Sequence, residues 1–146
     1  MKFIKTKLVK SPSRGTPESA GLDFYIPEGE NGESIIIQPG QSVNIPSGIK
    51  MIIPKGKAGI FFNKSGVGVK GVIVGACVVD SDYRGEVHLN VHNVSNKEVE
   101  FRPGQKLVQM LIIDVDLVSA EEITDDEFNS QSNTIRGSGG FGSTGA

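Results

Sequence analysis

The sequence predicts an all-β protein of the sandwich or jelly-roll type, because it is rich in turns, alternates over short segments and contains little helix. Glycine makes up 19 of the 146 residues and proline 7, and a glycine share well above the usual roughly 7% indicates many tight turns. Between the turns, apolar and polar residues alternate over a few positions at a time, as in half-buried strands. A single domain of this length can bury a hydrophobic core without staples.

The first half of the chain contains five short segments of this kind. Strands are expected at residues 4–8, LDFYI, SIII, SVNI and IKMII. The intervening sequences PSRGTPESAG, PEGENGE, QPGQ, PSG and PKGKAG are rich in the residues that set turn dihedrals. Their spacing suits a sandwich or jelly roll.

The second half predicts three longer strands. VIVGACVV is apolar throughout, as a strand buried on both faces would be. EVHLNVHN places Val87, Leu89 and Val91 on one face, and the turn DSDYRG is expected to join these two strands as a hairpin. KLVQMLIIDV predicts the last strand, ending near Val115. SGVGVKG has three glycines in seven residues, which predicts one short helical turn at most.

The end of the chain differs in composition, which predicts a core at 1–117 followed by a linker and glycine-rich arm at 118–146. SAEEITDDEFNSQSNT is acidic and polar, as linkers are. Residues 119–135, if extended, would span up to about 55 to 60 Å, enough to reach a neighbouring subunit. The final RGSGGFGSTGA has the composition of a flexible, disordered terminus.

The charge and cysteine content limit the partners and the compartment. Fifteen basic and 17 acidic side chains give a net charge of -2, so no global basic field attracts nucleic acid or a membrane. The single Cys77 excludes a disulfide framework, and no segment suits a signal peptide or a membrane span. We expect a soluble protein of the reducing cytoplasm, or of the host cytoplasm or nucleus if its source is viral or eukaryotic.

Two residues near the DSDYRG turn are candidates for chemistry. Asp80 directly follows an apolar strand, where desolvation would strengthen it as a base or as a group that orients water. The alternative is a turn aspartate that bonds to its own backbone. Tyr83 either packs against the core or stacks on a flat ligand.

Three further features suggest anion or metal binding. Lys64, Ser65 and Gly66 offer a cation, a hydroxyl and consecutive amides, which together can cradle phosphate, although such surface turns are common. Gln109 lies inside an apolar strand, so it is either a ligand contact or a satisfied core amide. His88 and His92 share the polar face of a strand, but without a third ligand they do not predict a zinc site.

The glycine-rich tail also has the parts of a lid that orders on a nucleotide. Its glycines let the main chain approach a polyphosphate closely. Arg136 supplies a bidentate cation, Ser138, Ser143 and Thr144 add hydroxyls, and Phe141 can stack over a base. Because no strand precedes GSGG and no helix follows it, it is not a dinucleotide-binding fingerprint.

Taken in order, AGLDFY, NKSG, GACVVDSDYRGEV, GQKLVQ and RGSGGFGSTG resemble the five motifs of the trimeric dUTPase family, over the chain from Ala20 to Gly145. The resemblance implies a distorted jelly-roll homotrimer with three active sites between subunits. It implies hydrolysis of dUTP to dUMP and pyrophosphate, which keeps uracil out of DNA and supplies dUMP for thymidylate synthesis. It also implies that the C-terminal arm closes over the active site of a neighbouring subunit.

The resemblance assigns a role to each candidate residue. Asp80 matches the carboxylate that positions and deprotonates the water attacking the α-phosphorus, and Asp23 matches a supporting carboxylate. Tyr83 matches the aromatic that packs on deoxyribose and rejects a ribose hydroxyl, and the hairpin around Cys77 and His88 matches the main chain that pairs with uracil. The remaining residues expected to bind substrate are Lys64, Ser65, Gly66, Gln109, Arg136, Phe141, Gly142, Ser143 and Thr144. Mg²⁺ is expected as cofactor, held through the triphosphate and waters without direct protein ligands.

The sequence departs from the family pattern at several positions. Lys64 stands where arginine is usual, which exchanges a bidentate fork for a point charge. Gln105 and Lys106 stand where aspartate and arginine are common, so a supporting ion pair between motifs is open to rearrangement.

The sequence leaves two other functions open. One is a dCTP deaminase of the same fold, whose catalytic glutamate would fall at Asn90, so no deamination is predicted. The other is a non-catalytic trimeric module that binds or regulates a partner.

Overall fold

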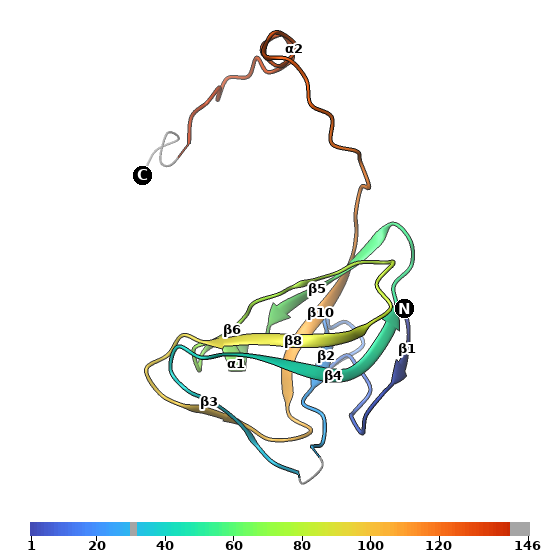
Figure 1. Cartoon of the computed structure of the whole chain (residues 1–146), viewed down its shortest axis with the longest axis vertical. Helices are drawn as coiled ribbons and strands as arrows, with labels where there is room; N and C mark the ends of the chain where they lie inside the picture. Colours follow the sequence, from blue (N-terminus) through green and yellow to red (C-terminus); the bar gives the residue numbers. More distant parts are fainter. Residues whose placement is uncertain (30–31, 141–146) are drawn as a thin grey trace. The chain divides into compact units, whose positions relative to one another are not determined.

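The computed structural model describes residues 1–29 and 32–140, and their regular secondary structure is mostly strand (Figure 1). The predicted all-β class is confirmed. The strands are β1 Lys2–Lys5, β2 Leu22–Tyr25, β3 Ile35–Ile37, β4 Ser42–Ile52, β5 Lys57–Asn63, β6 Val72–Val74, β7 Val78–Val79, β8 Glu86–Asn93, β9 Val99–Phe101 and β10 Lys106–Asp114. The helices are α1 Ser65–Gly68 and α2 Asp125–Gln131.

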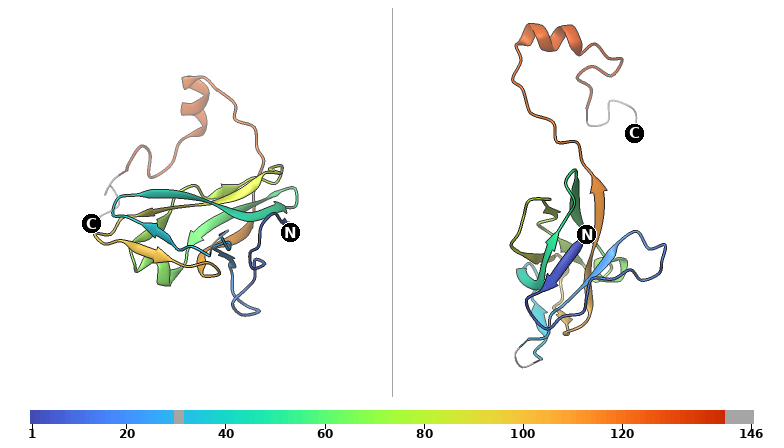
Figure 2. Two further views of the ribbon diagram at one scale, coloured as in Figure 1. Left: turned by 60° about the horizontal axis from the view of Figure 1, so that its bottom comes forward. Right: turned by 90° about the vertical axis from the view of Figure 1, so that its right-hand side faces the viewer.

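The strands form three antiparallel sheets, with the orders β1-β4-β8-β6, β2-β10-β5-β7 and β3-β9. The two four-stranded sheets are layered on each other (Figures 1 and 2), and one hydrophobic core takes side chains from both. The alternation predicted for β8 is confirmed, because Val87, Leu89 and Val91 are 3%, 1% and 0% exposed. The sheets remain separate over the described residues, as in a sandwich rather than a closed barrel.

Strand β4 corrects the prediction of two strands joined by a PSG turn. It runs without reversal through Pro46, which lies opposite His88 on β8, and pairing resumes with Lys50 opposite Glu86. The extra residues form a bulge at which Gly48 takes a φ of +74°. The PSG residues, which were predicted to form a turn, instead bend the strand, because β4 pairs with β8 both before and after them.

The apolar run VIVGACVV is also two strands rather than one. Strand β6 pairs with β8, whereas β7 pairs with β5 in the other sheet. Burial on both faces was wrong as well, because Ile73 and Val78 are 40% and 65% exposed. The DSDYRG turn therefore passes from one sheet to the other and closes no β7–β8 hairpin. The first strand also begins and ends earlier than predicted, at Lys2–Lys5, and Leu8 is exposed.

One of the two helices was expected. Helix α1 is the short turn predicted within SGVGVKG, whereas α2 lies in the segment predicted to be a linker. Thr124 and Glu127 form a capping box at its start, and the acidic side chains of the first turn interact favourably with the positive end of the helix dipole. Because 7 of the residues are helical, the full reach of residues 119–135 falls to about 45 Å.

The chain forms two compact units, Met1–Asp116 and a second that begins at Leu117. Within the described ranges, neither helix has the length and apolar character needed to cross a membrane.

Candidate active site

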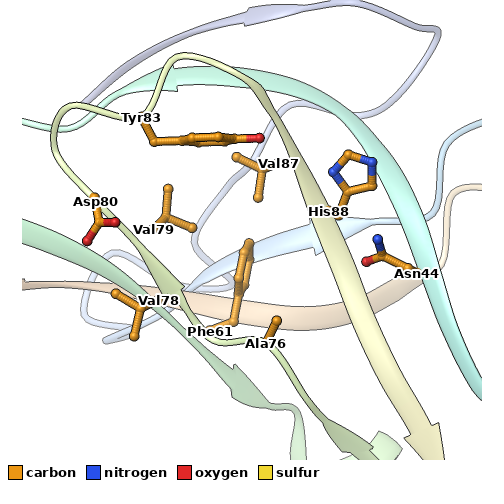
Figure 3. A pocket seen from close by; sticks show the side chains of 9 residues that line it. All are labelled: Asn44, Phe61, Ala76, Val78, Val79, Asp80, Tyr83, Val87 and His88. Atoms are coloured by element: carbon orange, nitrogen blue, oxygen red, sulfur yellow. The ribbon is translucent and has the colours of Figure 1, made fainter.

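A cavity of about 260 Å³ opens beside the turn that follows β7 (Figure 3). Its walls come from β4, β5, β7, β8 and the turn between the last two. The lining residues are Asn44, Phe61, Ala76, Val78, Val79, Asp80, Tyr83, Val87 and His88. Apolar walls with a few polar groups are typical of sites that bind small organic molecules.

Asp80 lies at one end of this cavity, where β7 ends (Figure 3). Its carbonyl oxygen accepts a hydrogen bond from the Tyr83 amide at 3.2 Å, so the main chain itself closes the turn. No group in the described part of the chain donates to its carboxylate, which differs from a turn aspartate that caps its own backbone. The side chain is exposed in the single chain, so the desolvation expected from the sequence is absent there. The carboxylate is free to accept a proton or to orient water.

Tyr83 lies along the cavity, with the ring above Val79 and Val87 (Figure 3). It is 44% exposed, and its hydroxyl donates to the Glu86 carbonyl oxygen at 3.0 Å. A Cβ at Gly85 would lie 2.9 Å from Tyr83 Cε2, so a side chain there would displace the ring. Of the two interpretations, a ring that faces a ligand fits this geometry better than a core ring.

The two other residues assigned to the hairpin differ in position. His88 lines the cavity at the end away from Asp80 (Figure 3), and its Nδ1 lies 3.0 Å from the Glu86 carbonyl oxygen. Cys77 is half-buried and does not line the cavity. Its thiol donates to the Gly75 carbonyl at 2.9 Å, and its own carbonyl accepts from the Phe61 amide at 2.8 Å.

A second group of polar residues, the Asp23 cluster, consists of Asp23, Lys64 and Lys106. Asp23 lies on β2, Lys64 precedes α1, and Lys106 begins β10. Lys64 Nζ is 2.5 Å from Asp23 Oδ1, and Lys106 Nζ is 2.6 Å from Oδ2. The Asp23 side chain is only 4% exposed, and each of its two oxygens pairs with one ammonium group. The sequence left open how the supporting ion pair is arranged. In the structure one carboxylate, Asp23, pairs with two lysines.

The lysines determine how Asp23 titrates. Burial alone raises the pKa of the Asp23 carboxyl, and it is the largest single effect. The hydrogen bonds from Lys106 and Lys64, together with their charges, outweigh it and hold the pKa below its usual range. The pKa of Lys106 is raised in return by its hydrogen bond to Asp23 and by the carboxylate charge. The lowered pKa of Asp23 and the raised pKa of Lys106 thus both favour the charged pair at neutral pH.

Three other candidate phosphate contacts lie near this cluster. Gln109 is opposite Asp23 in the β2–β10 register, and its Nε2 donates to the Asn63 carbonyl at 2.9 Å. Ser65 and Gly66 are exposed and begin α1. The amides of a first helical turn have no intrahelical acceptor, so they are available to an anion.

The candidate residues therefore fall into two groups. No residue of the Asp23 cluster is among those that line the cavity in the described part of the chain. The groups are linked through the core, because Phe24, next to Asp23, packs edge-on against the cavity residue Phe61 with ring centroids 5.0 Å apart.

The arm belongs to the second unit. Arg136 is exposed, and its Nε donates to the Gly139 carbonyl at 2.9 Å. Phe141, Gly142, Ser143 and Thr144 lie outside the described residues.

Sequence reasoning did not predict several members of these groups as site residues. Asn44 and Phe61 line the cavity without a local motif that marks them. Lys106 was noticed only as a departure from a pattern. It lies opposite Tyr25 in the β2–β10 register and pairs with Asp23, two residues away on β2, so the ion pair becomes visible only once the strand pairing is known.

Within residues 1–29 and 32–140, no three His, Cys, Asp or Glu side chains gather closely enough to hold a metal ion. Both oxygens of Asp23 are already engaged by lysines. Of the two candidate carboxylates, Asp23 and Asp80, this leaves Asp80 to face a hydrated ion.

Comparison with known proteins gives one consistent result. Residues 7–145 match the dUTPase family model. A deoxyuridine 5'-triphosphate nucleotidohydrolase from Debaryomyces hansenii is 35% identical over 144 residues, covering 98% of this chain and 85% of the relative. Among solved structures, a mutant dUTPase of Staphylococcus bacteriophage 80alpha with dUpNHpp has a TM-score of 0.85 at 18% identity, covering 99% of this chain and 98% of that one. A mutant dUTPase from phage phi11 of S. aureus, described with a structural Mg(II) ion, has a TM-score of 0.74 at 17% identity, covering 85% and 96%.

Proposed function

The chain belongs to the dUTPase family, and we propose from this premise that it is a dUTP diphosphatase, which hydrolyses dUTP to dUMP and pyrophosphate. The reaction removes the precursor of uracil in DNA and supplies dUMP for thymidylate synthesis. The observation that carries the proposal is the Asp80 carboxylate at the end of a small cavity beside Tyr83, which no hydrogen-bond donor of the described residues contacts. The cavity of about 260 Å³ is small for a whole triphosphate, which suits a site that encloses the nucleoside and leaves the phosphates outside.

Asp80 is the proposed general base. An acceptor-only carboxylate that receives no hydrogen bond from the described residues can take a proton from water and direct the oxygen at the α-phosphorus. The P–O bond to the leaving pyrophosphate breaks as the new P–O bond forms, and Asp80 holds the proton removed from the water. Its exposure in the single chain is expected to decrease when the nucleotide and a neighbouring arm cover it.

The nucleoside contacts follow from the cavity walls. Tyr83 packs against the deoxyribose in this proposal and excludes a 2′-hydroxyl. The main chain near Cys77 and His88 pairs with the polar edge of uracil.

Lys64, Ser65, Gly66 and Gln109 bind the phosphates. Phosphoryl transfer depends mainly on positioning and charge stabilisation, which amides, an amide side chain and an ammonium group supply. Asp23 supports them by holding Lys64 in place. Lys106 shares this carboxylate, so it limits how strongly Asp23 neutralises Lys64.

The active protein is proposed to be a homotrimer with sites shared between subunits. The separation of the cavity from the Asp23 cluster supports this arrangement, since a second copy can bring its own phosphate-binding residues to the cavity. The second unit supplies the arm, in which Arg136, Ser143 and Thr144 hold the β and γ phosphates and Phe141 and Gly142 cover uracil.

Mg²⁺ is the proposed cofactor. The donor set fits an ion carried by the substrate, because Mg²⁺ keeps several waters and binds readily to phosphate oxygens, and Asp80 is free to face those waters. When bound, the ion neutralises charge on the triphosphate. The proposal places the reaction in a reducing, cytoplasmic compartment, where Cys77 remains a free thiol.

The test is pyrophosphate release from dUTP, dTTP, dCTP and UTP in the presence of Mg²⁺. Release from dUTP alone is expected. Asp80→Asn should lower kcat by about 100- to 10,000-fold, the usual contribution of a general base, whereas Asp82→Asn in the same turn should leave it nearly unchanged. Ammonia release from dCTP would instead identify a deaminase. A folded protein that is inactive on all four nucleotides would favour the binding module.

A further inference from the structure

Two side chains of the cavity wall are held by the same main-chain atom. The Tyr83 hydroxyl donates to the Glu86 carbonyl oxygen at 3.0 Å, and His88 Nδ1 lies 3.0 Å from the same oxygen. Because a carbonyl oxygen can only accept, His88 carries a proton on Nδ1 and donates it. The Tyr83 hydroxyl is directed toward His88 (Figure 3), in keeping with two donors that share one acceptor. The position of the Glu86 carbonyl therefore sets the direction of both rings.

The strand that carries this carbonyl is incompletely paired at this point. Glu86 begins β8 and lies opposite Lys50 on β4, but the next pair along the two strands is His88 opposite Pro46. The β4 residues between these pairs form the bulge at Gly48. A bulge interrupts the hydrogen-bond ladder, so the start of β8 depends on other contacts as well.

The Glu86 side chain supplies such a contact across the bulge. Its Oε1 accepts from the Gly48 amide at 2.7 Å. The Gly48 carbonyl accepts in turn from the Thr6 amide at 2.8 Å, and a Cβ at Gly48 would lie only 3.1 Å from side-chain atoms of Lys7 and Val9. The bulge is thus held against the segment that follows β1 and can serve as an anchor for Glu86.

The charge of Glu86 has a weaker partner. Lys7 Nζ lies 3.9 Å from the same Oε1, and the two side chains are 44% and 21% exposed. An ion pair of this length and exposure contributes little. The hydrogen bond to the Gly48 amide is therefore the main contact of the carboxylate.

We propose that Glu86 is a positioning residue for sugar recognition. Its carboxylate holds the first residue of β8 against the bulge, and its main-chain carbonyl then keeps the Tyr83 ring in place against the sugar. Glu86 is not among the residues that line the cavity in the described part of the chain, so it acts through Tyr83. The inference rests on the proposed hydrolysis of dUTP, in which Tyr83 packs against the deoxyribose.

The test measures kcat/KM on dUTP and on UTP for wild type and for variants of Glu86. Glu86→Leu removes the acceptor at similar size and should lower the preference for dUTP over UTP about fivefold, as expected for the loss of one hydrogen bond. Glu86→Gln keeps an oxygen acceptor for the Gly48 amide and should retain the wild-type preference. Lys7→Met is the matched control, because it removes only the weak ion pair and should leave the preference unchanged.

A double-mutant cycle separates this role from a general effect on the fold. Tyr83→Phe keeps the ring but removes the hydroxyl that binds the Glu86 carbonyl. Glu86→Leu should therefore cause no further loss of preference when it is added to Tyr83→Phe. Independent losses in the double variant would overturn the inference, and so would an equal loss on dUTP and UTP for Glu86→Leu alone.

The remaining outcomes also decide. If Glu86→Leu does not fold, Glu86→Met takes its place, since methionine is unbranched like glutamate and has no oxygen acceptor, and the same loss of preference is expected. A Glu86→Gln variant as unselective as Glu86→Leu would overturn the inference, because the effect would then belong to the charge. Wild-type protein that fails to hydrolyse dUTP would overturn the proposed function and this inference with it. Active wild type whose sugar preference does not depend on Glu86 overturns the inference alone.

Discussion

Replacing Asp23 by asparagine tests the role of the buried carboxylate between two lysines. The Asp23 side chain is 4% exposed, and both ammonium groups lie within 2.6 Å of it. An asparagine keeps one acceptor for one lysine but directs its NH₂ donors at the other. Breaking a buried ion pair costs about 3 to 5 kcal/mol. Lys64 and Lys106 are 26% and 43% exposed and can regain water, so we expect a smaller loss of about 2 to 4 kcal/mol.

Urea unfolding at one fixed protein concentration measures this loss, because the stability of an oligomer depends on concentration. With a slope of about 2 kcal/mol per molar urea, the midpoint should fall by about 1 to 2 M. Asp114→Asn is the control, since it removes the carboxylate of an exposed pair with Lys57 in which Asp114 is 88% exposed, and it should cost at most about 1 kcal/mol. Equal effects of the two variants would refute the reasoning.

Three further predictions follow from the same structure. Because folding lowers the pKa of Asp23, this residue stabilises the fold at pH values above its unfolded-state pKa of about 3.9. The contribution is lost as the pH falls through the lower folded-state pKa. Wild type and Asp23→Asn should therefore converge in unfolding free energy at pH values below about 4, measured by urea titration. Gly85→Ala should displace the Tyr83 ring and lower the preference for dUTP over UTP in kcat/KM about tenfold, equivalent to about 1.4 kcal/mol. Gly29→Ala should not, because among the described residues its Cβ would meet nothing closer than 3.8 Å. Removing residues from Arg136 onward should leave sedimentation and thermal unfolding unchanged but abolish most dUTP turnover, and full turnover would show that the arm is dispensable.

Local patterns predicted the parts of the fold that depend on local physics. The alternation of Val87, Leu89 and Val91 identified the core face of β8 because a strand has a strict period of two. The pattern failed at Pro46–Gly48 and within VIVGACVV, where pairing with distant strands decides whether a chain bends, reverses or changes sheet. Helix α2 had a readable signal in Thr124 and Glu127, but acidic composition outweighed it.

The candidate site shows the same division. Asp80 and Tyr83 lie within one turn, so their proximity at the cavity could be predicted from the sequence. Asp23 meets Lys64 and Lys106 only through the pairing of β2 with β10 and the position of α1, so the charges were visible but their partners were not. The contact of Glu86 with Gly48 depends likewise on a bulge set by the pairing of β4 with β8.

The most direct test of the proposed reaction is hydrolysis of dUTP in H₂¹⁸O with mass analysis of both products. Attack of water on the α-phosphorus predicts dUMP carrying one ¹⁸O atom and unlabelled pyrophosphate in equal amounts. Label in the pyrophosphate, or formation of dUDP and orthophosphate, would contradict attack at the α-phosphorus and the role assigned to Asp80.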